Sequence, residues 1–415
     1  MSGVWTPEEA GRYLLGLELF GMRFGLDRMH RLMTVLGHPE RAYDAIHVVG
    51  TNGKSSTVRM IAAILERHGL RTGAYLSPHL VEFWERIRVG DHDLDADAFA
   101  AAVQRAAGAA AKVDRTLSEG DRVTQFEALT AAAYAELAAQ RIDVAAVEAG
   151  LGGRYDATSV IDSRVQVLTN VGLEHQRWLG PTLRDIAREK LAVVRPGGTL
   201  VCGDLAPEVE EEARAAAHVA GARLLFAPAE AGVPVAAPGA FQRRNFALAR
   251  AAAEAYLGEL DDASVRAAAA AVQVPGRMQV VAREPLTIVD GAHNPSGMQA
   301  LVEALPEVVG ERPLVAAVAV LDDKDAAAML RALLPACDAV VFTRARNPRA
   351  YPPATLQSLA QQLGFRSNFT AAAADDALRR ARELAGDEGA VLATGSIYLV
   401  ADLAAPAEGR RASTL

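Results

Sequence analysis

Cysteine is nearly absent from this 415-residue sequence, which has only Cys202 and Cys337. Two cysteines so far apart provide neither a disulfide framework nor a metal-binding knuckle, so we expect a reduced, cytoplasmic protein. An excess of positive charge is also missing, because 43 lysines and arginines face 51 aspartates and glutamates, for a net charge of -8. That balance argues against a protein that wraps nucleic acid.

Long apolar runs and aromatic residues are scarce as well. No uncharged stretch is hydrophobic and long enough to cross a bilayer, and the N-terminus lacks the basic and apolar segments of a signal peptide. Aromatic residues make up 5%, but hydrophobic residues make up 51%, which excludes global disorder. We therefore expect two or three folded domains with no membrane partner.

Alanine-rich stretches alternate with short β-branched runs along the chain. The former predict helices, because alanine has the highest helix propensity; they include 98–111, 128–139, 213–220 and 265–272. The latter predict strands at Ala45–Gly50, Val144–Glu148, Val165–Asn170, Thr199–Gly203, Leu286–Asp290, Leu314–Val320, Ala339–Thr343 and Ala390–Thr394. This alternation is typical of an α/β fold with parallel sheets covered by helices on both faces.

A break in the pattern separates two domains. Residues 273–285 contain two prolines and a glycine, and a fresh series of strands and helices follows. We predict a large domain at 1–275, a linker at 276–285 and a smaller α/β domain at 286–415, which at roughly 130 residues has an ordinary domain size.

A glycine-containing loop follows the first strand of the large domain. Gly50 to Thr57 reads GTNGKSST and precedes a helical pattern, which places backbone N–H groups and a helix N-terminus where an anion binds. We predict that nucleotide phosphates contact Asn52, Gly53, Lys54, Ser55 and Ser56, with Lys54 at the β- and γ-phosphates and a serine hydroxyl near Mg²⁺. The full P-loop pattern is not met, because Val48 occupies the position of its first glycine. The alternative is a tight turn between strand and helix that binds no ligand.

Two further polar residues lie at or just beyond strand ends. Glu148 ends a predicted strand and His175 follows another, at the sheet edge where open α/β folds bind ligands. Mg²⁺ prefers oxygen ligands, which suits the carboxylate better than the imidazole. A solvated glutamate and a structural histidine are the alternatives that position alone leaves open.

Ordered motifs over some 350 residues resemble the folylpolyglutamate synthase/dihydrofolate synthase family of the Mur ligase superfamily. The blocks are GTNGKSS at 50–56, SPHL at 77–80, ERI at 85–87, EAGLGGRYDAT at 148–158, LTNVGLEHQRWLG at 168–180, REK at 188–190, PGR at 275–277, DGAHNP at 290–295 and TGS at 394–396. The resemblance implies an N-terminal P-loop NTPase-like Mur ligase central domain plus a smaller C-terminal Rossmann-like α/β domain. It also implies an ATP-dependent ligase that activates a folate carboxylate as an acyl phosphate and joins it to L-glutamate.

The same resemblance implies the ions and the catalytic groups. Two Mg²⁺ ions are expected, with Ser77, Glu148 and His175 as ligands. Lys190 is expected to carry a carbamate, which converts an ammonium into an anionic oxygen ligand and requires a lysine with a lowered pKa. Lys54, Lys190 and His293 are the implied catalytic residues, although a surface helix is the simpler reading for Lys190.

Substrate residues follow from the resemblance in the same way. The site for dihydropteroate or folate is expected at Thr124, Gln125, Phe126, Glu127, Tyr155, Asp156 and Ala157. ATP contacts are expected at Asn245, Arg277 and Asp290, and the glutamate site at His293 and Ser396. From the residues alone, Thr124 could be a helix N-cap with Phe126 in the core, and His293 and Ser396 could be cap or turn residues. Ser159 replaces the family's asparagine, which leaves its local contact open.

Two other function classes compete with this hypothesis. A cell-wall Mur ligase would carry an extra domain before the phosphate loop, for which some 46 residues are too few. A nucleotide-binding ATPase without ligation would not need the DGAHNP and TGS blocks of a second domain. Dihydrofolate synthase activity, folate form and glutamate tail length stay open, and a monomer is expected from the resemblance alone.

Overall fold

The computed structural model describes residues 3–18 and 25–405, and it falls into two compact units. The first unit contains residues up to 236 together with 244–272, and the second contains 237–243 and the residues from 273 onward. Within 276–285, which the sequence suggests as a linker, the structure has a strand of the second unit at Gln279–Arg283 (β9). None of the helices in these described ranges has the length and apolar character needed to cross a membrane.

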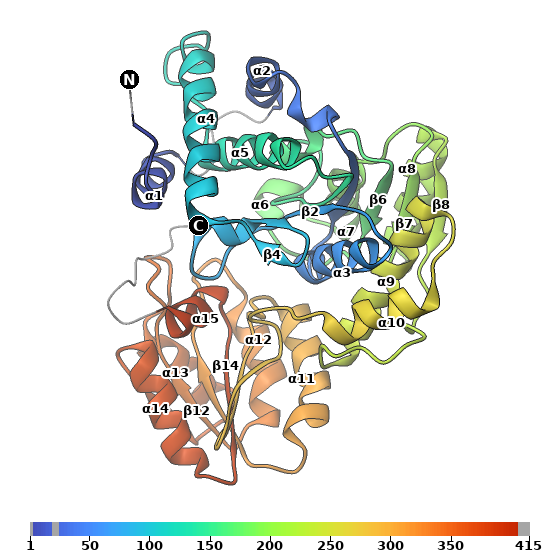
Figure 1. The fold of residues 1–415 in the computed structure, drawn as a ribbon. Coiled ribbons are helices and arrows are strands. Elements are labelled where there is room, and N and C mark those ends of the chain that lie inside the picture. The colour runs from blue at the N-terminus through green and yellow to red at the C-terminus, as the bar shows by residue number, and fades with distance from the viewer. Residues whose placement is uncertain (1–2, 19–24, 406–415) are drawn as a thin grey trace. The chain divides into compact units, whose positions relative to one another are not determined.

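The first unit is built on an eight-stranded sheet with the order β4-β3-β2-β5-β1-β6-β7-β8 (Figure 1). Its strands are Asp44–Val49 (β1), Thr72–Tyr75 (β2), Ile87–Val89 (β3), His92–Asp93 (β4), Val144–Glu148 (β5), Val165–Leu168 (β6), Thr199–Cys202 (β7) and Arg223–Phe226 (β8). Along the sheet, the neighbouring strands β2, β5, β1, β6, β7 and β8 all pair in parallel. At the other end, β3 pairs antiparallel with β2, and β4 pairs antiparallel with β3. The central parallel strands β1, β5 and β6 are almost entirely buried, as a sheet covered on both faces requires, whereas the edge strand β8 is partly exposed.

Helices cover both faces of this sheet. They are Pro7–Leu15 (α1), Asp27–Leu36 (α2), Lys54–Arg67 (α3), Ala96–Asp114 (α4), Gln125–Ala139 (α5), Gln176–Leu179 (α6), Leu183–Leu191 (α7), Pro207–Ala220 (α8), Ala240–Leu257 (α9) and Asp262–Ala271 (α10). The helices α1, α2, α4 and α5 share one core with Ala45, Tyr75 and Val147 of the sheet. The opposite side holds α3, which contacts β2 and β5 and packs against α10 (Figure 1).

Many of these helices are rich in alanine, and small side chains take the place of aromatic ones in their packing. In α5, eleven of fifteen residues are buried and seven of its positions are alanine, so neighbouring elements approach it closely. The single-turn helices Pro39–Arg41, Phe83–Arg86, Ala157–Val160 and Leu334–Ala336 connect the larger elements.

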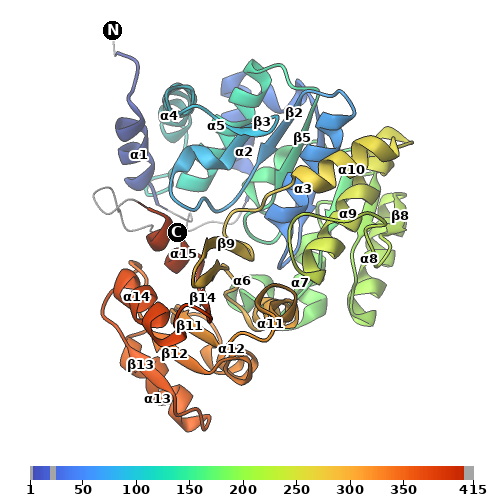
Figure 2. The ribbon, with the colours of Figure 1, turned by 60° about the horizontal axis from the view of Figure 1, so that its bottom comes forward.

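The second unit has a six-stranded sheet with the order β13-β12-β11-β14-β10-β9 (Figure 2). Besides β9 it contains Leu286–Val289 (β10), Leu314–Val318 (β11), Ala339–Phe342 (β12), Asn368–Thr370 (β13) and Ala390–Thr394 (β14), and only β9 runs antiparallel. The helices are Pro295–Val309 (α11), Ala326–Leu333 (α12), Pro353–Gln362 (α13), Ala374–Ala385 (α14) and Ile397–Ala404 (α15). A doubly covered α/β sheet is therefore present in each unit, as the alternation of elements predicts.

Candidate active site

Four neighbouring parallel strands of the first unit end at one sheet edge. In the order β2-β5-β1-β6, their carboxyl ends lead to Ser77, Glu148, the phosphate loop and Asn170. Because parallel strands end on the same side, side chains far apart in sequence meet there. The candidate site is built on this edge.

The phosphate loop is fixed by contacts to the residues after β6. The backbone N–H of Thr51 donates to the Asn170 carbonyl at 2.9 Å, and that of Asn52 donates to Asn170 Oδ1 at 3.0 Å. Gly53 has φ +82°, and a Cβ there would lie 2.5 Å from Oδ1 of Asn245, so the close approach requires glycine. Asn52, Gly53 and Asn245, predicted separately, are therefore brought to one place. Asn170 is a site residue that the sequence patterns do not predict, although its place at the end of a predicted strand is a signal that could have identified it.

Both lysines of the predicted site bind the loop backbone. Lys54 Nζ donates to the carbonyls of Gly50 (3.1 Å) and Thr51 (3.2 Å), and Lys190 Nζ donates to Gly50 at 2.8 Å. Lys190 lies near the end of α7, whose first turn is closed by a capping box between Thr182 and Asp185. The surface-helix alternative for Lys190 is excluded, because the residue is only 5% exposed.

Burial changes the protonation of Lys190. Removal of water from the amine, with a smaller contribution from the charge of Lys54, lowers the Lys190 pKa from 10.5 to about 7; Glu174 and Asp156 oppose the shift. A substantial share of the amine is therefore neutral near pH 7, which is the form that reacts with CO₂.

The Glu148 carboxylate is held on both oxygens by groups of the site. Ser55 Oγ donates to Oε1 at 2.9 Å and the Ser77 backbone N–H donates to Oε2 at 3.1 Å. Glu148 is 2% exposed, so the solvated strand-end alternative does not apply. The neighbouring Ser56 is also buried.

His175 adopts a left-handed backbone conformation (φ +54°) just before α6. Its ring nitrogen Nε2 lies 3.7 Å from the Glu174 carboxylate, and its side chain is 40% exposed. No cluster of three or more His, Cys, Asp or Glu side chains with metal-binding geometry occurs within residues 3–18 and 25–405. The groups that contact Glu148 are the Ser55 hydroxyl and the Ser77 backbone N–H. Metal binding by Ser77, Glu148 and His175 stays a prediction.

The predicted acceptor residues at 124–127 open α5 as a capping box. Thr124 Oγ1 accepts from the Glu127 N–H, and the Glu127 carboxylate accepts from the Thr124 N–H and from Arg28 Nε at 3.0 Å. Gln125 donates to the carbonyl of Leu14. The cap offered by the sequence as an alternative is thus present, and contact of these residues with substrate stays a prediction.

Phe126 reaches the loop that follows Glu148. Its ring lies against Gly150, where a Cβ would come within 2.7 Å of the ring, and it stacks with Tyr75 at a centroid distance of 6.2 Å. In the same loop Tyr155 is half exposed, Asp156 is buried and Ala157 belongs to the core. The structure therefore brings the two predicted acceptor segments together in the first unit.

The predicted residues of the second unit gather at the carboxyl ends of β10 and β14. Asp290 follows β10, and its carboxylate accepts the N–H groups of Met278 (2.8 Å) and Ala292 (2.7 Å). Burial raises the Asp290 pKa, and the charge of nearby Arg277 opposes this. His293 Nδ1 donates to the Gly291 carbonyl at 2.8 Å.

For Ser396, the sequence leaves open whether the side chain caps a helix or binds the substrate. Its hydroxyl accepts from the Tyr398 N–H at the start of α15, and it is 1% exposed. The cap is present in the structure, and the glutamate contact stays a prediction.

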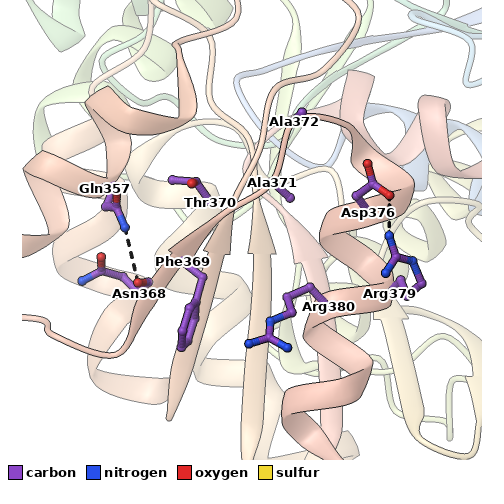
Figure 3. A pocket seen from close by; sticks show the side chains of 9 residues that line it. All are labelled: Gln357, Asn368, Phe369, Thr370, Ala371, Ala372, Asp376, Arg379 and Arg380. Carbon is purple, nitrogen blue, oxygen red and sulfur yellow. Dashed lines mark hydrogen bonds and ion pairs between the residues drawn. The ribbon is translucent and has the colours of Figure 1, made fainter.

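A pocket of about 580 Å³ lies elsewhere in the second unit, between β13 and α14 (Figure 3). Arg379 pairs with Asp376 at 2.6 Å and Arg380 with Glu383 at 3.0 Å, so both guanidinium charges are compensated. None of the residues predicted from sequence lines it. We therefore do not include it in the candidate site.

Comparison with known proteins gives consistent matches. Residues 276–397 match the family described as Mur ligase, glutamate ligase domain. The chain is 34% identical over 392 residues to a dihydrofolate synthase/folylpolyglutamate synthase of Mycobacterium tuberculosis, covering 83% of this chain and 80% of the relative. It is 31% identical to the Bacillus subtilis protein of the same name, covering 95% and 98%.

Solved structures agree over nearly the full length. Folylpolyglutamate synthase of M. tuberculosis, complexed with ADP and AMPPCP, has a TM-score of 0.89 at 31% identity and covers 95% of this chain and 97% of its own. Escherichia coli FolC in complex with DHPP and ADP has a TM-score of 0.85 at 28% identity, with coverage of 96% and 97%. The bifunctional Yersinia pestis enzyme with AMPPNP and a Mn ion has a TM-score of 0.84 at 29% identity, with coverage of 97% and 98%.

Proposed function

The chain belongs to the dihydrofolate synthase/folylpolyglutamate synthase family, and we propose the following mechanism for its ligase activity. It is an ATP-dependent, amide-forming ligase that adds glutamate to folate. The folate carboxylate attacks the γ-phosphate of ATP, giving an acyl phosphate and ADP. The amine of L-glutamate then attacks the acyl carbon, so that an amide forms, phosphate leaves and the amine loses its proton.

The observation that carries this proposal is the pairing of Glu148 with the phosphate loop. Ser55, in the first turn after the loop, donates to the carboxylate that ends the neighbouring strand. Backbone N–H groups at the N-terminus of α3 suit the phosphates of ATP, and Lys54 supplies a charge beside them.

Structures of relatives contain ATP analogues and, in one case, a Mn ion, which supports ATP and a divalent metal as cofactors. We propose that both bind at this edge of the sheet. Mg²⁺ fits it, because Mg²⁺ is usually held by one or two carboxylates, waters and substrate phosphates, and Glu148 with the Ser55 and Ser77 oxygens is such a donor set. His175 is the weakest of the proposed ligands, since imidazole is not a preferred partner of Mg²⁺. When bound, Mg²⁺ neutralises charge that develops on the transferred phosphoryl group.

We further propose that Lys190 carries a carbamate. Its neutral amine adds to CO₂, forming an N–C bond and releasing one proton, so that a neutral buried amine becomes an anionic oxygen donor. The low pKa of Lys190 supports this, as does the position of the amine beside the loop carbonyl that also receives Lys54. A second metal ion would then gain a hard oxygen ligand.

The acceptor site is proposed at the loop around Gly150 and the start of α5. Phe126 offers an aromatic ring for a pterin, and Asp156 and Tyr155 follow in the adjoining loop. A pterin site of this kind serves dihydropteroate as well as folate, and we propose both as substrates.

In the second unit, Arg277 and Asp290 are proposed to contact ATP, and His293 and Ser396 to serve the glutamate site. We thus propose that a few cationic side chains and Mg²⁺ compensate the charges of the three anionic substrates, although the protein has a net charge of -8. A monomeric state, a cytoplasmic location and the absence of nucleic-acid partners stay predictions.

Phe126→Ala tests the acceptor site. Removal of the ring beside Gly150 should raise the KM for dihydropteroate and for tetrahydrofolate by roughly tenfold each, because the stacking energy of an aromatic pair is lost. The KM for ATP should stay within about twofold. Steady-state kinetics with each acceptor measure both values.

Phe99→Leu is the matched control, because Phe99 is a core residue of α4 that stacks with Phe83. It should lower stability without changing either acceptor KM. If Phe126→Ala affected only one acceptor, the two acceptors would not share this site, and if it affected neither, the proposed site would be wrong.

A further inference from the structure

A chain of buried hydrogen bonds links β1 to the proposed acceptor loop. His47 Nε2 lies 2.8 Å from Thr158 Oγ1, and the Thr158 hydroxyl in turn bonds Asp156 Oδ1. The other Asp156 oxygen accepts the N–H of Leu151 at 2.7 Å. His47 and Thr158 are fully buried, and the sequence predicts no functional role for either.

The direction of the hydrogen bonds in this chain follows from the chemistry of its members. Burial raises the Asp156 pKa, and hydrogen bonds from the Thr158 hydroxyl and from the backbone N–H groups of Leu151, Thr158 and Gly150 oppose this rise by stabilising the ionised carboxylate. An ionised carboxylate only accepts, so the single Thr158 hydroxyl proton points to Asp156. The remaining lone pair of Oγ1 then accepts from His47, which must carry its proton on Nε2.

The opposite ring nitrogen of His47 is buried and has no hydrogen-bond partner in the described chain. Burial, with the charge of Arg195, lowers the His47 pKa to about 3, so the ring is neutral at physiological pH. An apolar residue would fill this strand position without leaving a polar atom unsatisfied. The imidazole therefore contributes what an apolar residue could not, an N–H group that donates to the Thr158 hydroxyl oxygen.

The segment that this chain holds is the one that reaches the acceptor. Gly150 lies under the Phe126 ring, and Leu151 follows directly. The Thr158 backbone is fixed independently, because its carbonyl accepts from Tyr134 at 2.8 Å. Rotation of the Thr158 hydroxyl is therefore controlled by His47 on one side and Asp156 on the other.

We propose that His47 and Thr158 are positioning residues that orient the Asp156 carboxylate and, through it, the Gly150–Leu151 backbone, and thereby set the affinity for the pterin-bearing acceptor. Neither residue touches the substrate. The inference rests on the proposed function, in which this loop binds the acceptor.

Two matched pairs of variants test the proposal. Thr158→Val keeps the shape and removes the hydroxyl, whereas Thr158→Ser keeps the hydroxyl. His47→Asn withdraws the donor from Thr158, whereas His47→Gln places an amide nitrogen near the position of Nε2. We expect Thr158→Val and His47→Asn to raise the acceptor KM about tenfold, with the KM for ATP and for glutamate within about twofold, and the conservative variants to stay within about threefold.

A double variant provides the sharper readout. If His47 acts through Thr158, His47→Asn combined with Thr158→Val should raise the acceptor KM no more than the more severe single variant does. Additive effects would overturn the proposal. A parallel rise in the KM for ATP and acceptor, accompanied by a lower Tm, would also overturn it, because that pattern describes general loss of structure.

His68→Asn is the structural control. His68 Nδ1 donates to the Ile64 carbonyl at 2.7 Å and Nε2 accepts the Asp261 N–H at 2.9 Å, so it also joins two elements of the first unit. It should lower the Tm and leave the acceptor KM unchanged; a raised acceptor KM would show that any loss of stability mimics the effect and would overturn the proposal.

Asp156→Asn separates failure of the inference from failure of the proposed function. If Asp156→Asn raises the acceptor KM but His47→Asn and Thr158→Val do not, the inference is wrong and the acceptor site stands. If Asp156→Asn also has no effect, the acceptor site itself is wrong, and the inference fails with it.

The protonation state of His47 can also be measured in the unmodified protein, so this test does not depend on whether a variant folds. Nitrogen-15 NMR of the histidine rings should show His47 neutral and protonated on Nε2 from about pH 5 to about pH 8. Protonation on Nδ1 instead would contradict the direction derived for the chain.

Discussion

Replacement of Lys190 by alanine is expected to lower kcat by at least about 100-fold, which is the scale of losing one preorganised electrostatic group in an active site. The amine is buried against the Gly50 carbonyl of the phosphate loop, and its pKa is lowered to about 7. The proposed carbamate is lost with the side chain. Added acetate should restore part of the activity of Lys190→Ala, because a small carboxylate can occupy the vacated volume.

Lys190→Arg is the matched control, since it keeps a cation but cannot form the carbamate. It should be as inactive as Lys190→Ala and should gain nothing from acetate, because no volume is vacated. In the unmodified enzyme, removal of CO₂ and bicarbonate should lower activity reversibly, and intact-protein mass spectrometry should detect the added CO₂. Full activity of Lys190→Ala without acetate or bicarbonate would disprove the carbamate role.

The same lysine makes stability depend on pH. Its pKa is about 7 in the folded protein against an ordinary 10.5, so burial of the charged form is unfavourable. Between these values the unfolded state binds more protons, and the free energy of unfolding therefore rises with pH. The destabilisation by Lys190 is complete below pH of about 7 and disappears as the pH approaches 10.5.

Urea unfolding in CO₂-free buffer measures this linkage. The stability advantage of Lys190→Met over the unmodified protein should shrink by a few kcal/mol from about pH 7 to about pH 10. A difference that is constant with pH would show that the Lys190 pKa is not lowered in the folded protein.

Glu148→Gln is expected to lower kcat/KM by about 100-fold and to raise the Mg²⁺ concentration needed for half-maximal activity. The substitution keeps the size of the side chain but removes its charge. Its amide nitrogen would also face either the Ser55 hydroxyl or the Ser77 N–H, each of which now donates to a carboxylate oxygen. Initial rates over a Mg²⁺ titration measure both effects.

Glu66→Gln is the control for this experiment. The Glu66 carboxylate likewise accepts from a hydroxyl (2.6 Å) and a backbone N–H (3.1 Å), both of Thr72, but Glu66 is in the last turn of α3 and meets the beginning of β2, away from the strand ends that carry the candidate site. Activity should stay within about twofold while stability falls by about 1 kcal/mol. An equal loss of activity in both variants would mean that Glu148 has no special part in the reaction.

Regular elements with a strong local pattern could be predicted from the sequence. The strands predicted at Val144–Glu148 and Ala390–Thr394 have the same bounds in the structure, because β-branched runs between alanine-rich helices are unambiguous. Strand β9 was not predicted, since residues 279–283 follow a Pro-Gly turn and pair only through the later β10. Likewise, the grouping of 237–243 with the second unit depends on contacts such as Arg243 to Glu307, which no local pattern encodes.

For the candidate site, strand ends were more informative than residue types. Glu148 and Ser77 meet because their strands are neighbours, and a strand-end carboxylate was recognisable in the sequence. The burial of Lys190 was not, since a lysine in a charged REK segment has the pattern of a surface helix. His47 also escaped notice, because a histidine within an apolar strand gives no sign of the hydroxyl that it meets 111 residues later.

Steady-state ADP release tests the central claim most directly. The purified protein is given ATP and Mg²⁺ with the folate acceptor alone, with glutamate alone, and with both. If the chain is a ligase as described, continuous ADP formation requires both acceptor and glutamate, and one amide forms per ADP. ADP turnover that is indifferent to both substrates would contradict the account.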